Sequence, residues 1–248
     1  AELARVERLD EEVVVSADEP VELRRLDVYP SELSADRMLT ALHDFLLKGD
    51  SRRKDVLFGR EDPEFADGDP RGDDRTYVDN NDAQNEAVNL AVDAEDFALV
   101  HGPPGTGKTY TIARTIRALV EDGNRVLLSA FTNRAVDNAL EALRDQGFEN
   151  CVAAEAQRNG GGETADVVRV GTESGVREDM QDLRLEQAGD PGERAAERRD
   201  ASVVAATTAT CGSRVMREQS FDVALVDEAS QLTEPATLAA VNLSDRFV

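Results

Sequence analysis

Cysteine and histidine are scarce in this chain of 248 residues, which contains two of each. Cys151 and Cys211 are too few for a disulfide framework or for a four-cysteine metal site. With only His43 and His101 beside them, a zinc or iron–sulfur centre is not expected. This cysteine usage favours a reducing, cytoplasmic compartment.

Long apolar runs are also missing. No run of about 18 apolar residues occurs, so the sequence predicts neither a membrane-spanning helix nor a membrane partner. The first residues lack the basic-then-apolar pattern of a secretory signal. The chain begins at Ala1 rather than methionine, and its last residues, 246–248, have the pattern of a strand that is only beginning. We therefore expect a fragment of a longer protein.

Lysine is nearly absent, because 25 of the 28 basic residues are arginine, and 51 acidic residues bring the net charge to −23. A lysine-poor acidic surface suits a cytoplasm of very high salt, in which charge repulsion is screened. We therefore expect a halophilic protein. An acidic regulatory protein is the alternative, although the charge is not gathered in a tail. The acidity argues against a broad electrostatic footprint on nucleic acid but leaves room for a local arginine-lined groove.

The composition predicts three regions along the chain. Residues 1–60 are expected to form an accessory region of strands and a helix, and residues 61–78, rich in Asp, Gly, Pro and Arg, a linker. Residues 79–248 are expected to form the main domain. Within the accessory region, short β-like pieces are expected at 13–15 and 21–23, and a helix at 34–48.

Strands and helices alternate through the main domain. Helices are expected at 79–93, 108–121 and 134–146, and strands at 97–101, 125–130, 167–170, 202–208 and 222–226. This alternation predicts an α/β fold with a parallel sheet and flanking helices. The charged stretch 178–200 is expected to be a mostly helical, solvated insertion.

A glycine-rich loop joins the expected strand 97–101 to the helix that follows. It comprises Gly102, Pro103, Pro104, Gly105, Thr106, Gly107, Lys108 and Thr109. This is the G-x-x-x-x-G-K-[ST] phosphate loop, in which glycines let backbone N–H groups wrap a polyphosphate. Lys108 can reach the β- and γ-phosphates, and the Thr109 hydroxyl can hold Mg²⁺. The pattern predicts a nucleotide site.

Two carboxylates follow the apolar strand 222–226. Open parallel sheets bind ligands at the carboxyl ends of their strands, where Asp227 and Glu228 stand. Asp227 is expected to hold Mg²⁺, and Glu228 to orient and deprotonate the attacking water. With the phosphate loop upstream, this pair predicts hydrolysis of a nucleoside triphosphate by positioning and charge stabilisation.

Five short blocks occur in a fixed order through residues 79–248. They are Asn-Asp-Ala-Gln at 81–84, the phosphate loop at 102–109, Ser-Ala-Phe-Thr-Asn-Arg-Ala-Val-Asp-Asn at 129–138, Val-Val-Ala-Ala-Thr-Thr at 203–208 and Val-Asp-Glu-Ala-Ser-Gln at 226–231. This order resembles the first RecA-like domain of superfamily 1B helicases, the branch that holds the RNA-surveillance helicases and the replication helicase–nuclease. Three of its features look closest to the helicase–nuclease: Asp-Glu-Ala-Ser-Gln at 227–231, Phe-Thr-Asn-Arg-Ala-Val-Asp-Asn at 131–138 and Val-Arg-Val-Gly at 168–171.

The resemblance implies a role for several residues. Gln84 would read adenine and select ATP, and residues 1–60 would correspond to an accessory barrel and stalk. The family's contacts with single-stranded nucleic acid fall on Thr132, Asn133, Thr207 and Thr208. Each of these residues also has a purely structural alternative. Thr132 and Asn133 could only cap a helix, Thr207 and Thr208 could be ordinary strand-end residues, and Gln84 could be an amide on a helix surface.

The resemblance implies an ATP- and Mg²⁺-dependent DNA helicase motor that moves 5′→3′ in replication or repair. In this family ATP lies between two RecA-like domains, and the second would belong to the same polypeptide. Without its arginine fingers, turnover by this chain alone is expected to be very slow. The alternatives are an RNA helicase of the same branch, an inactive ATP- or nucleic-acid-binding fragment, and a P-loop ATPase that is not a helicase.

Overall fold

The computed structural model describes part of the chain in detail. The described residues are 5–9, 13–16, 32–66, 75–150, 166–185 and 198–248. The chain divides into two compact units, residues 1–32 and 33–248. In the first unit, β1 (Arg5–Leu9) and β2 (Val13–Ser16) form an antiparallel pair. The strand predicted at 13–15 is therefore confirmed, with an upstream partner, whereas the piece at 21–23 lies outside the described residues.

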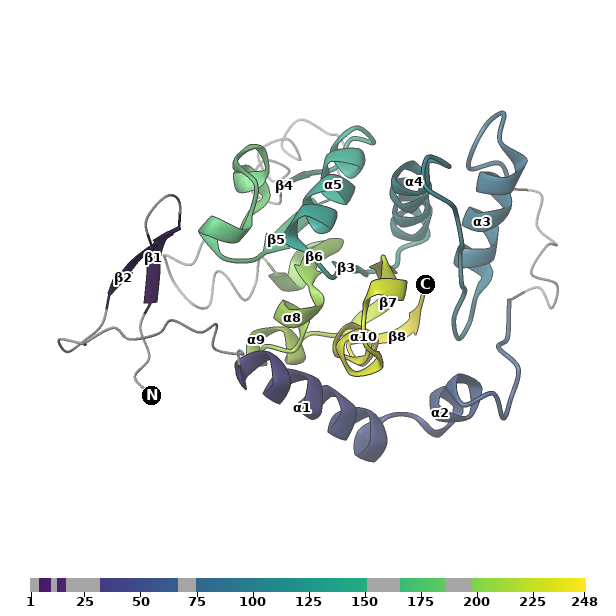
Figure 1. Cartoon of the computed structure of the whole chain (residues 1–248). Helices are drawn as coiled ribbons and strands as arrows, with labels where there is room; N and C mark the ends of the chain where they lie inside the picture. Colours follow the sequence, from purple (N-terminus) through teal and green to yellow (C-terminus); the bar gives the residue numbers. More distant parts are fainter. Residues whose placement is uncertain (1–4, 10–12, 17–31, 67–74, 151–165, 186–197) are drawn as a thin grey trace. The chain divides into compact units, whose positions relative to one another are not determined.

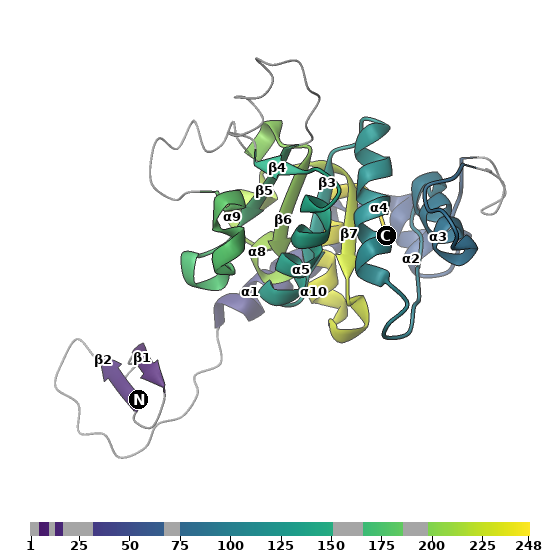
Figure 2. The same cartoon turned by 90° about the horizontal axis from the view of Figure 1, so that it is seen from above.

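A six-stranded parallel sheet forms the centre of the second unit. Its strands are β3 (Val126–Ala130), β4 (Glu149–Asn150), β5 (Asp166–Val170), β6 (Val203–Thr207), β7 (Phe221–Asp227) and β8 (Ser244–Phe247). They lie in the order β4-β5-β6-β3-β7-β8, which Figure 2 shows for the central strands. Strands β3 and β6 are buried along their whole length, as expected for strands covered on both faces. The predicted P-loop, RecA-like α/β fold is confirmed.

Helices cover both faces of the sheet (Figures 1 and 2). One layer contains α3 (Asp82–Asp93), α4 (Lys108–Glu121) and α5 (Asn133–Arg144). The other contains α1 (Glu32–Lys48), α8 (Thr208–Cys211), α9 (Arg214–Arg217) and α10 (Glu234–Val241). Successive residues of β3 divide between the two layers, since Leu128 packs with the first and Leu127 with the second. No helix in the described part of the chain is long and apolar enough to cross a bilayer.

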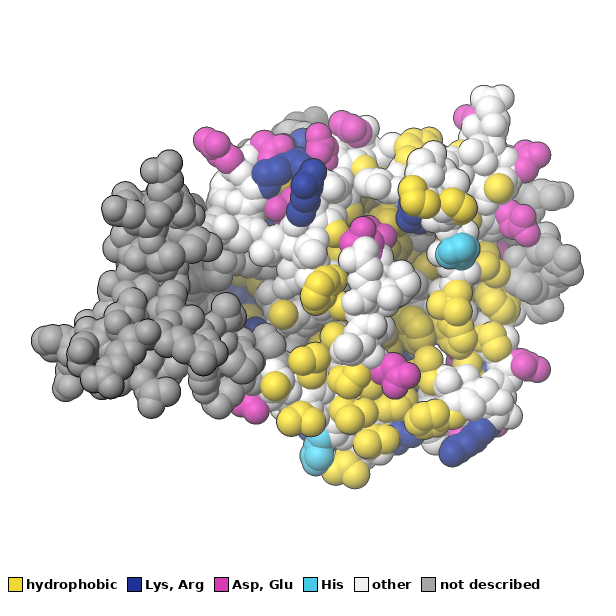
Figure 3. Space-filling view, viewed as in Figure 1, with side chains coloured by type: hydrophobic (Ala, Val, Ile, Leu, Met, Phe, Trp, Pro, Cys, Tyr) yellow, Lys and Arg dark blue, Asp and Glu magenta, His cyan; other side chains and the backbone are white. Residues whose placement is uncertain are grey.

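The helix predicted at 34–48 is confirmed as α1, and the short helix α2 (Ser51–Leu57), which the sequence did not predict, follows it. Both helices belong to the sheet-bearing unit: Arg37 donates to the Ala209 carbonyl at 2.8 Å, and Asn242 donates to the Ala41 carbonyl at 2.8 Å. The assignment of residues 1–60 as an accessory region stays a prediction. Figure 3 shows hydrophobic side chains gathered on the face where α1 lies. Leu39 and Leu47 of α1 are 64% and 70% exposed.

The strand predicted at 97–101 is wrong over most of its length. Phe97 forms a single parallel bridge with Phe247, and the two rings stack with centroids 5.2 Å apart. Ala98 donates to the Phe247 carbonyl at 3.1 Å, but the ladder goes no further. Leu99 is 75% exposed because β8 ends at Phe247 and leaves no described strand beside it. The phosphate-loop segment nevertheless lies next to β8, so one strand separates it from β7.

Candidate functional site

The phosphate loop has the backbone conformation that its glycines predict. Gly105 and Gly107 adopt positive φ angles of 84° and 78°, which side-chain-bearing residues rarely take. Gly107 also begins α4, and no side chain caps this helix end. The first N–H groups of a 14-residue helix are therefore left for another acceptor, and a helix N-terminus favours an anion.

Lys108 and Thr109 stand at the start of the same helix. The Lys108 ammonium donates to the Gly102 carbonyl at 2.7 Å and approaches the Pro103 carbonyl at 3.3 Å, so it lies against the loop's own backbone. The Thr106 hydroxyl donates to the same Pro103 carbonyl at 2.8 Å. The Thr109 side chain is exposed. Both groups that the sequence assigned to phosphate and Mg²⁺ are thus at the loop.

Gln84 reaches the phosphate loop from α3. Its side-chain amide donates to the Thr106 carbonyl at 2.8 Å. The helix start that positions it is capped by Asn81, whose side chain accepts the Gln84 N–H at 3.1 Å. The residue predicted to read adenine and the loop predicted to bind phosphate therefore meet, although they are far apart in the sequence. A Cβ added to Gly107 would lie only 2.6 Å from the Gln84 amide nitrogen.

The substitution Gly107→Ala is expected to weaken ATP binding by roughly tenfold, because the new methyl group displaces Gln84 and unmakes its hydrogen bond. Gly123→Ala is the matched control, since Gly123 has a φ of 84° but open space where a Cβ would go. Both variants carry similar backbone strain. Titration with a fluorescent ATP analogue and thermal melting separate the effects, and equal ATP binding by the two variants would contradict this account.

The second half of the site follows the buried strand β7. Burial raises the pKa of the Asp227 carboxyl, and the Glu228 N–H and the charge of Lys108 act in the opposite direction. The Glu228 N–H donates to the Asp227 carboxylate at 2.9 Å. The positive charge of Lys108 in the phosphate loop thus favours the ionised form of the Asp227 carboxyl. The Glu228 side chain is exposed, and its backbone has a φ of 55°, a strained conformation for a residue with a Cβ and one that clusters at functional sites.

The pKa shift of Asp227 makes a stability prediction. A carboxylate whose pKa rises on folding destabilises the folded state when it is ionised. The destabilisation is present in full when the pH is above the folded-state pKa, and it is absent when the pH is below the unfolded-state pKa. Asp227→Asn removes this penalty, so its melting temperature without magnesium should exceed that of the parent chain at neutral pH. The gain should disappear in acid. Melting curves from about pH 4 to pH 8 test this. Exposed Asp145→Asn should show no such trend, and a lower melting temperature for Asp227→Asn at neutral pH would refute the prediction.

The four residues predicted to contact nucleic acid differ in exposure. Thr132 is exposed and caps α5 by accepting the Ala135 N–H at 3.1 Å, and the exposed Asn133 accepts a hydrogen bond from Arg169 at 2.8 Å. Thr207 caps α8, and Thr207 and Thr208 are only 7% and 3% exposed. Thr132 and Asn133 are therefore accessible in this conformation, while the second pair is largely inside. Nucleic-acid contact by all four stays a prediction.

Comparison with known families agrees with this geometry. The model of the AAA domain matches residues 79–198 and 193–248, which is more than half of the chain. The chain belongs to the AAA domain family. The match includes the phosphate loop, Asp227 and Glu228.

Curated relatives of this AAA domain are helicases. The DNA replication ATP-dependent helicase/nuclease DNA2 of Saccharomyces cerevisiae is 33% identical over 169 residues, 66% of this chain and 10% of that protein. The helicase/nuclease JHS1 of Arabidopsis thaliana is 30% identical over 171 residues, 68% of this chain and 12% of that protein. An uncharacterized ATP-dependent helicase of Methanocaldococcus jannaschii is 40% identical over 124 residues, 48% of this chain and 18% of that protein. The similarity is to a superfamily 1 helicase motor domain, and the chain spans a small part of each relative.

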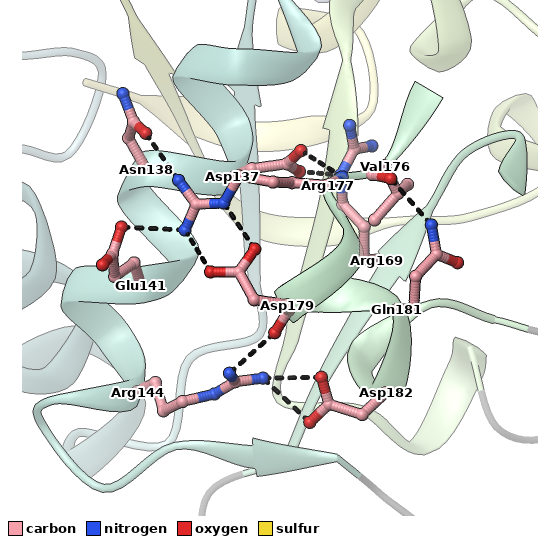
Figure 4. Close-up of polar contacts among 10 residues, drawn as sticks. All are labelled: Asp137, Asn138, Glu141, Arg144, Arg169, Val176, Arg177, Asp179, Gln181 and Asp182. Carbon is pink, nitrogen blue, oxygen red and sulfur yellow. Dashed lines mark hydrogen bonds and ion pairs between the residues drawn. The ribbon is translucent and has the colours of Figure 1, made fainter. Parts of the chain in front are cut away.

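A buried ion pair in this AAA domain was not predicted from the sequence (Figure 4). Arg169 on β5 and Asp137 on α5 are 0% and 2% exposed, and the Arg169 Nε donates to Asp137 at 3.0 Å. Burial lowers the pKa of the Arg169 guanidinium, and Asp137 opposes the shift. The same guanidinium donates a hydrogen bond to Asn133. The ion pair therefore helps to position one of the residues predicted to contact nucleic acid. Both residues lie in blocks quoted for the family resemblance, but nothing in the sequence showed that they meet.

Arg144 and Arg177 form hydrogen bonds and ion pairs between α5 and the segment after β5 (Figure 4). This segment contains the 3₁₀ turns η1 (Glu173–Gly175) and η2 (Glu178–Leu183). The Arg177 N–H donates to Asp137 at 2.9 Å, and the Arg177 side chain bridges Asp179 and Glu141. The stretch predicted as mostly helical thus begins in described 3₁₀ turns, and residues 186–197 lie outside the described residues.

Proposed function

We propose that the chain forms the first motor domain of an ATP-dependent DNA helicase that moves 5′→3′ along a single strand in replication or repair. Two observations carry the proposal: Gln84 contacts the phosphate loop, and the charge of Lys108 in that loop acts on Asp227 of β7. Thr132 and Asn133 are exposed at the end of the neighbouring strand β3. The relatives named as helicases support the same reading.

The chemistry follows from the groups present. The loop N–H groups and Lys108 bind the phosphates, and the Gln84 amide binds adenine. The hydroxyl of Thr109 and the carboxylate of Asp227 suit Mg²⁺, which prefers oxygen ligands and would neutralise phosphate charge. Glu228 orients the attacking water and accepts its proton. A second RecA-like domain of the same polypeptide supplies the remaining transition-state charge.

DNA is proposed as the substrate because the sequence features at 131–138, 168–171 and 227–231 resemble the helicase–nuclease and because curated relatives are named as DNA helicases. An RNA helicase of the same branch is the second candidate. The acidic, lysine-poor composition leads us to propose a halophilic protein, so assays belong in molar KCl.

Strand displacement by the full-length protein tests the proposal. A labelled DNA duplex with a 5′ single-stranded overhang should be unwound with Mg-ATP, and the same duplex with a 3′ overhang should not. The variant Lys108→Ala should unwind neither. Unwinding only from the 3′ overhang would reverse the proposed polarity, and unwinding of an RNA duplex but not DNA would favour the second candidate.

A further inference from the structure

Five apolar side chains are exposed on α1 and at the end of α2. They are between 37% and 70% exposed, and we call them the α1–α2 patch: Leu39, Leu46, Leu47, Leu57 and Phe58. Leu39, Leu46 and Leu47 fall at helical spacing on one side of α1, opposite the buried Ala41 and Phe45. The outer side of a surface helix is normally polar, and an exposed apolar patch marks a site of interaction.

The two helices hold the patch together. The Phe45 and Phe58 rings meet edge to face, with their centroids 6.2 Å apart. The Lys54 ammonium of α2 donates to the Leu46 carbonyl of α1 at 3.0 Å. The C-terminal part of α1 therefore lies against α2, and the exposed side chains of the two helices adjoin.

A hollow of about 200 Å³ opens at the α2 end of the patch. Its apolar lining comprises Val56, Leu57 and the stacked rings of Phe97 and Phe247. The two arginines in its lining are already engaged, since Arg52 binds Asp96 and Arg53 donates to backbone carbonyl groups at the start of β8. The hollow can therefore take one apolar side chain of a partner, the kind of anchor on which interfaces depend.

Basic residues border the patch. Residues 39–60 contain five basic and three acidic residues, although the chain as a whole carries a net charge of −23. Two of the three lysines of the chain, Lys48 and Lys54, belong to this segment. The side chains of Lys48 and Arg60 are 69% and 67% exposed. The surface around the patch is thus basic within an acidic protein.

The three acidic residues of the same segment are already engaged. Asp44 is shared by Lys48, at 2.8 Å, and Arg217. Asp55 binds Arg60 at 2.9 Å, and the third aspartate caps α2 with its side chain. Two cations share the first of these carboxylates, so the border of the patch favours an approaching carboxylate over an approaching cation.

We propose that the α1–α2 patch docks an amphipathic helix of a partner protein, with apolar side chains on the patch and carboxylates beside its basic border. Apolar contact would supply the affinity, and the opposite charges would select and orient the partner. A second copy of this chain, placed patch to patch, would bring two basic borders together. Four of the five patch residues are leucines, which offer no stacking surface to a nucleic acid base.

A fluorescein-labelled helical peptide of about 18 residues tests the proposal, with leucines along one face, glutamates on both flanks of that face and alanines elsewhere. Anisotropy should show that it binds the full-length protein at the lowest KCl concentration at which the protein stays folded. The same peptide with lysines in place of the glutamates should bind about tenfold more weakly, because like charges then meet at the border. This preference should shrink as KCl is raised.

Variants of the patch locate the binding site of the glutamate peptide. Leu47→Ser and Phe58→Ala should each weaken its binding by about tenfold. Phe131→Ala is the matched control, since Phe131 is 52% exposed, close to the 57% of Phe58, but follows β3 and lies outside the patch. It should leave the peptide affinity unchanged. Replacing Lys48 and Lys54 together by glutamine should remove most of the preference for glutamate over lysine.

The other possible occupants of the patch give different results. Failure of the glutamate peptide to bind, or equal binding of the two peptides, would overturn the proposal. A parent protein that sediments as a dimer and becomes monomeric on Leu47→Ser would assign the patch to a second copy instead. A clearly lower melting temperature of Leu47→Ser would show that the full-length protein itself covers the patch, and displacement of the peptide by oligo-dT would assign the patch to nucleic acid. Strand displacement tests the proposed function separately.

Discussion

Replacing Glu228 by glutamine is expected to lower the strand-stimulated ATP turnover of the full-length protein by about 10²–10⁴-fold, the usual contribution of a general base. Glutamine keeps the size of the side chain but cannot accept the proton of the attacking water. ATP affinity should be nearly unchanged, because the phosphate loop, Gln84 and Asp227 are intact. Phosphate release at saturating ATP measures the turnover, and titration with a fluorescent ATP analogue measures the affinity.

Glu234→Gln is the matched control for this experiment. Glu234 is an exposed glutamate in the first turn of α10, six positions after Glu228, and no role in the site is assigned to it. Its replacement should leave turnover unchanged. Turnover by Glu228→Gln at close to the parent rate would show that another group activates the water, and the assignment of Glu228 would then be wrong.

The second large effect is expected from the buried ion pair between Asp137 and Arg169. Replacing Asp137 by alanine leaves the guanidinium of Arg169 buried without its carboxylate, which typically lowers the free energy of unfolding by ~3–5 kcal/mol. The substitution also removes the acceptor of the Arg177 N–H, so the segment after β5 loses a contact with α5. Denaturant unfolding in molar KCl measures the change.

A more exposed ion pair, between Arg144 at the end of α5 and Asp182 of η2, provides the control. Arg144 contacts both oxygens of Asp182 at 2.8 Å, and both side chains are partly or largely exposed. Asp182→Asn should therefore change the free energy of unfolding by less than about 1 kcal/mol. A similarly small effect of Asp137→Ala would show that the buried pair contributes little to the stability of this domain.

The sequence predicted the main features of the nucleotide site because these depend on local chemistry. Glycines at 105 and 107 indicate positive φ angles, and a lysine and a threonine at a helix start indicate an anion site, so the loop could be predicted without its surroundings. The parallel sheet followed from the alternation of apolar strands and helices. The contact between Gln84 and Thr106 could be expected only through the family resemblance, because nothing local shows that α3 packs against the loop.

The features that escaped prediction depend on contacts between distant segments. The apolar run at 97–101 has the composition of a buried strand, yet only its first residues find a neighbour in β8. Arg169 occupies a buried strand position that composition alone would give to an apolar residue, and its partner lies 32 residues upstream.

ATP hydrolysis by the full-length protein, measured in molar KCl with and without oligo-dT, tests the central claim most directly. The proposed motor should hydrolyse ATP slowly alone and several times faster with the single strand, and Lys108→Ala should abolish both rates. The same rate with and without DNA or RNA strands, in a protein that hydrolyses ATP through Lys108, would contradict the claim that this site drives a helicase.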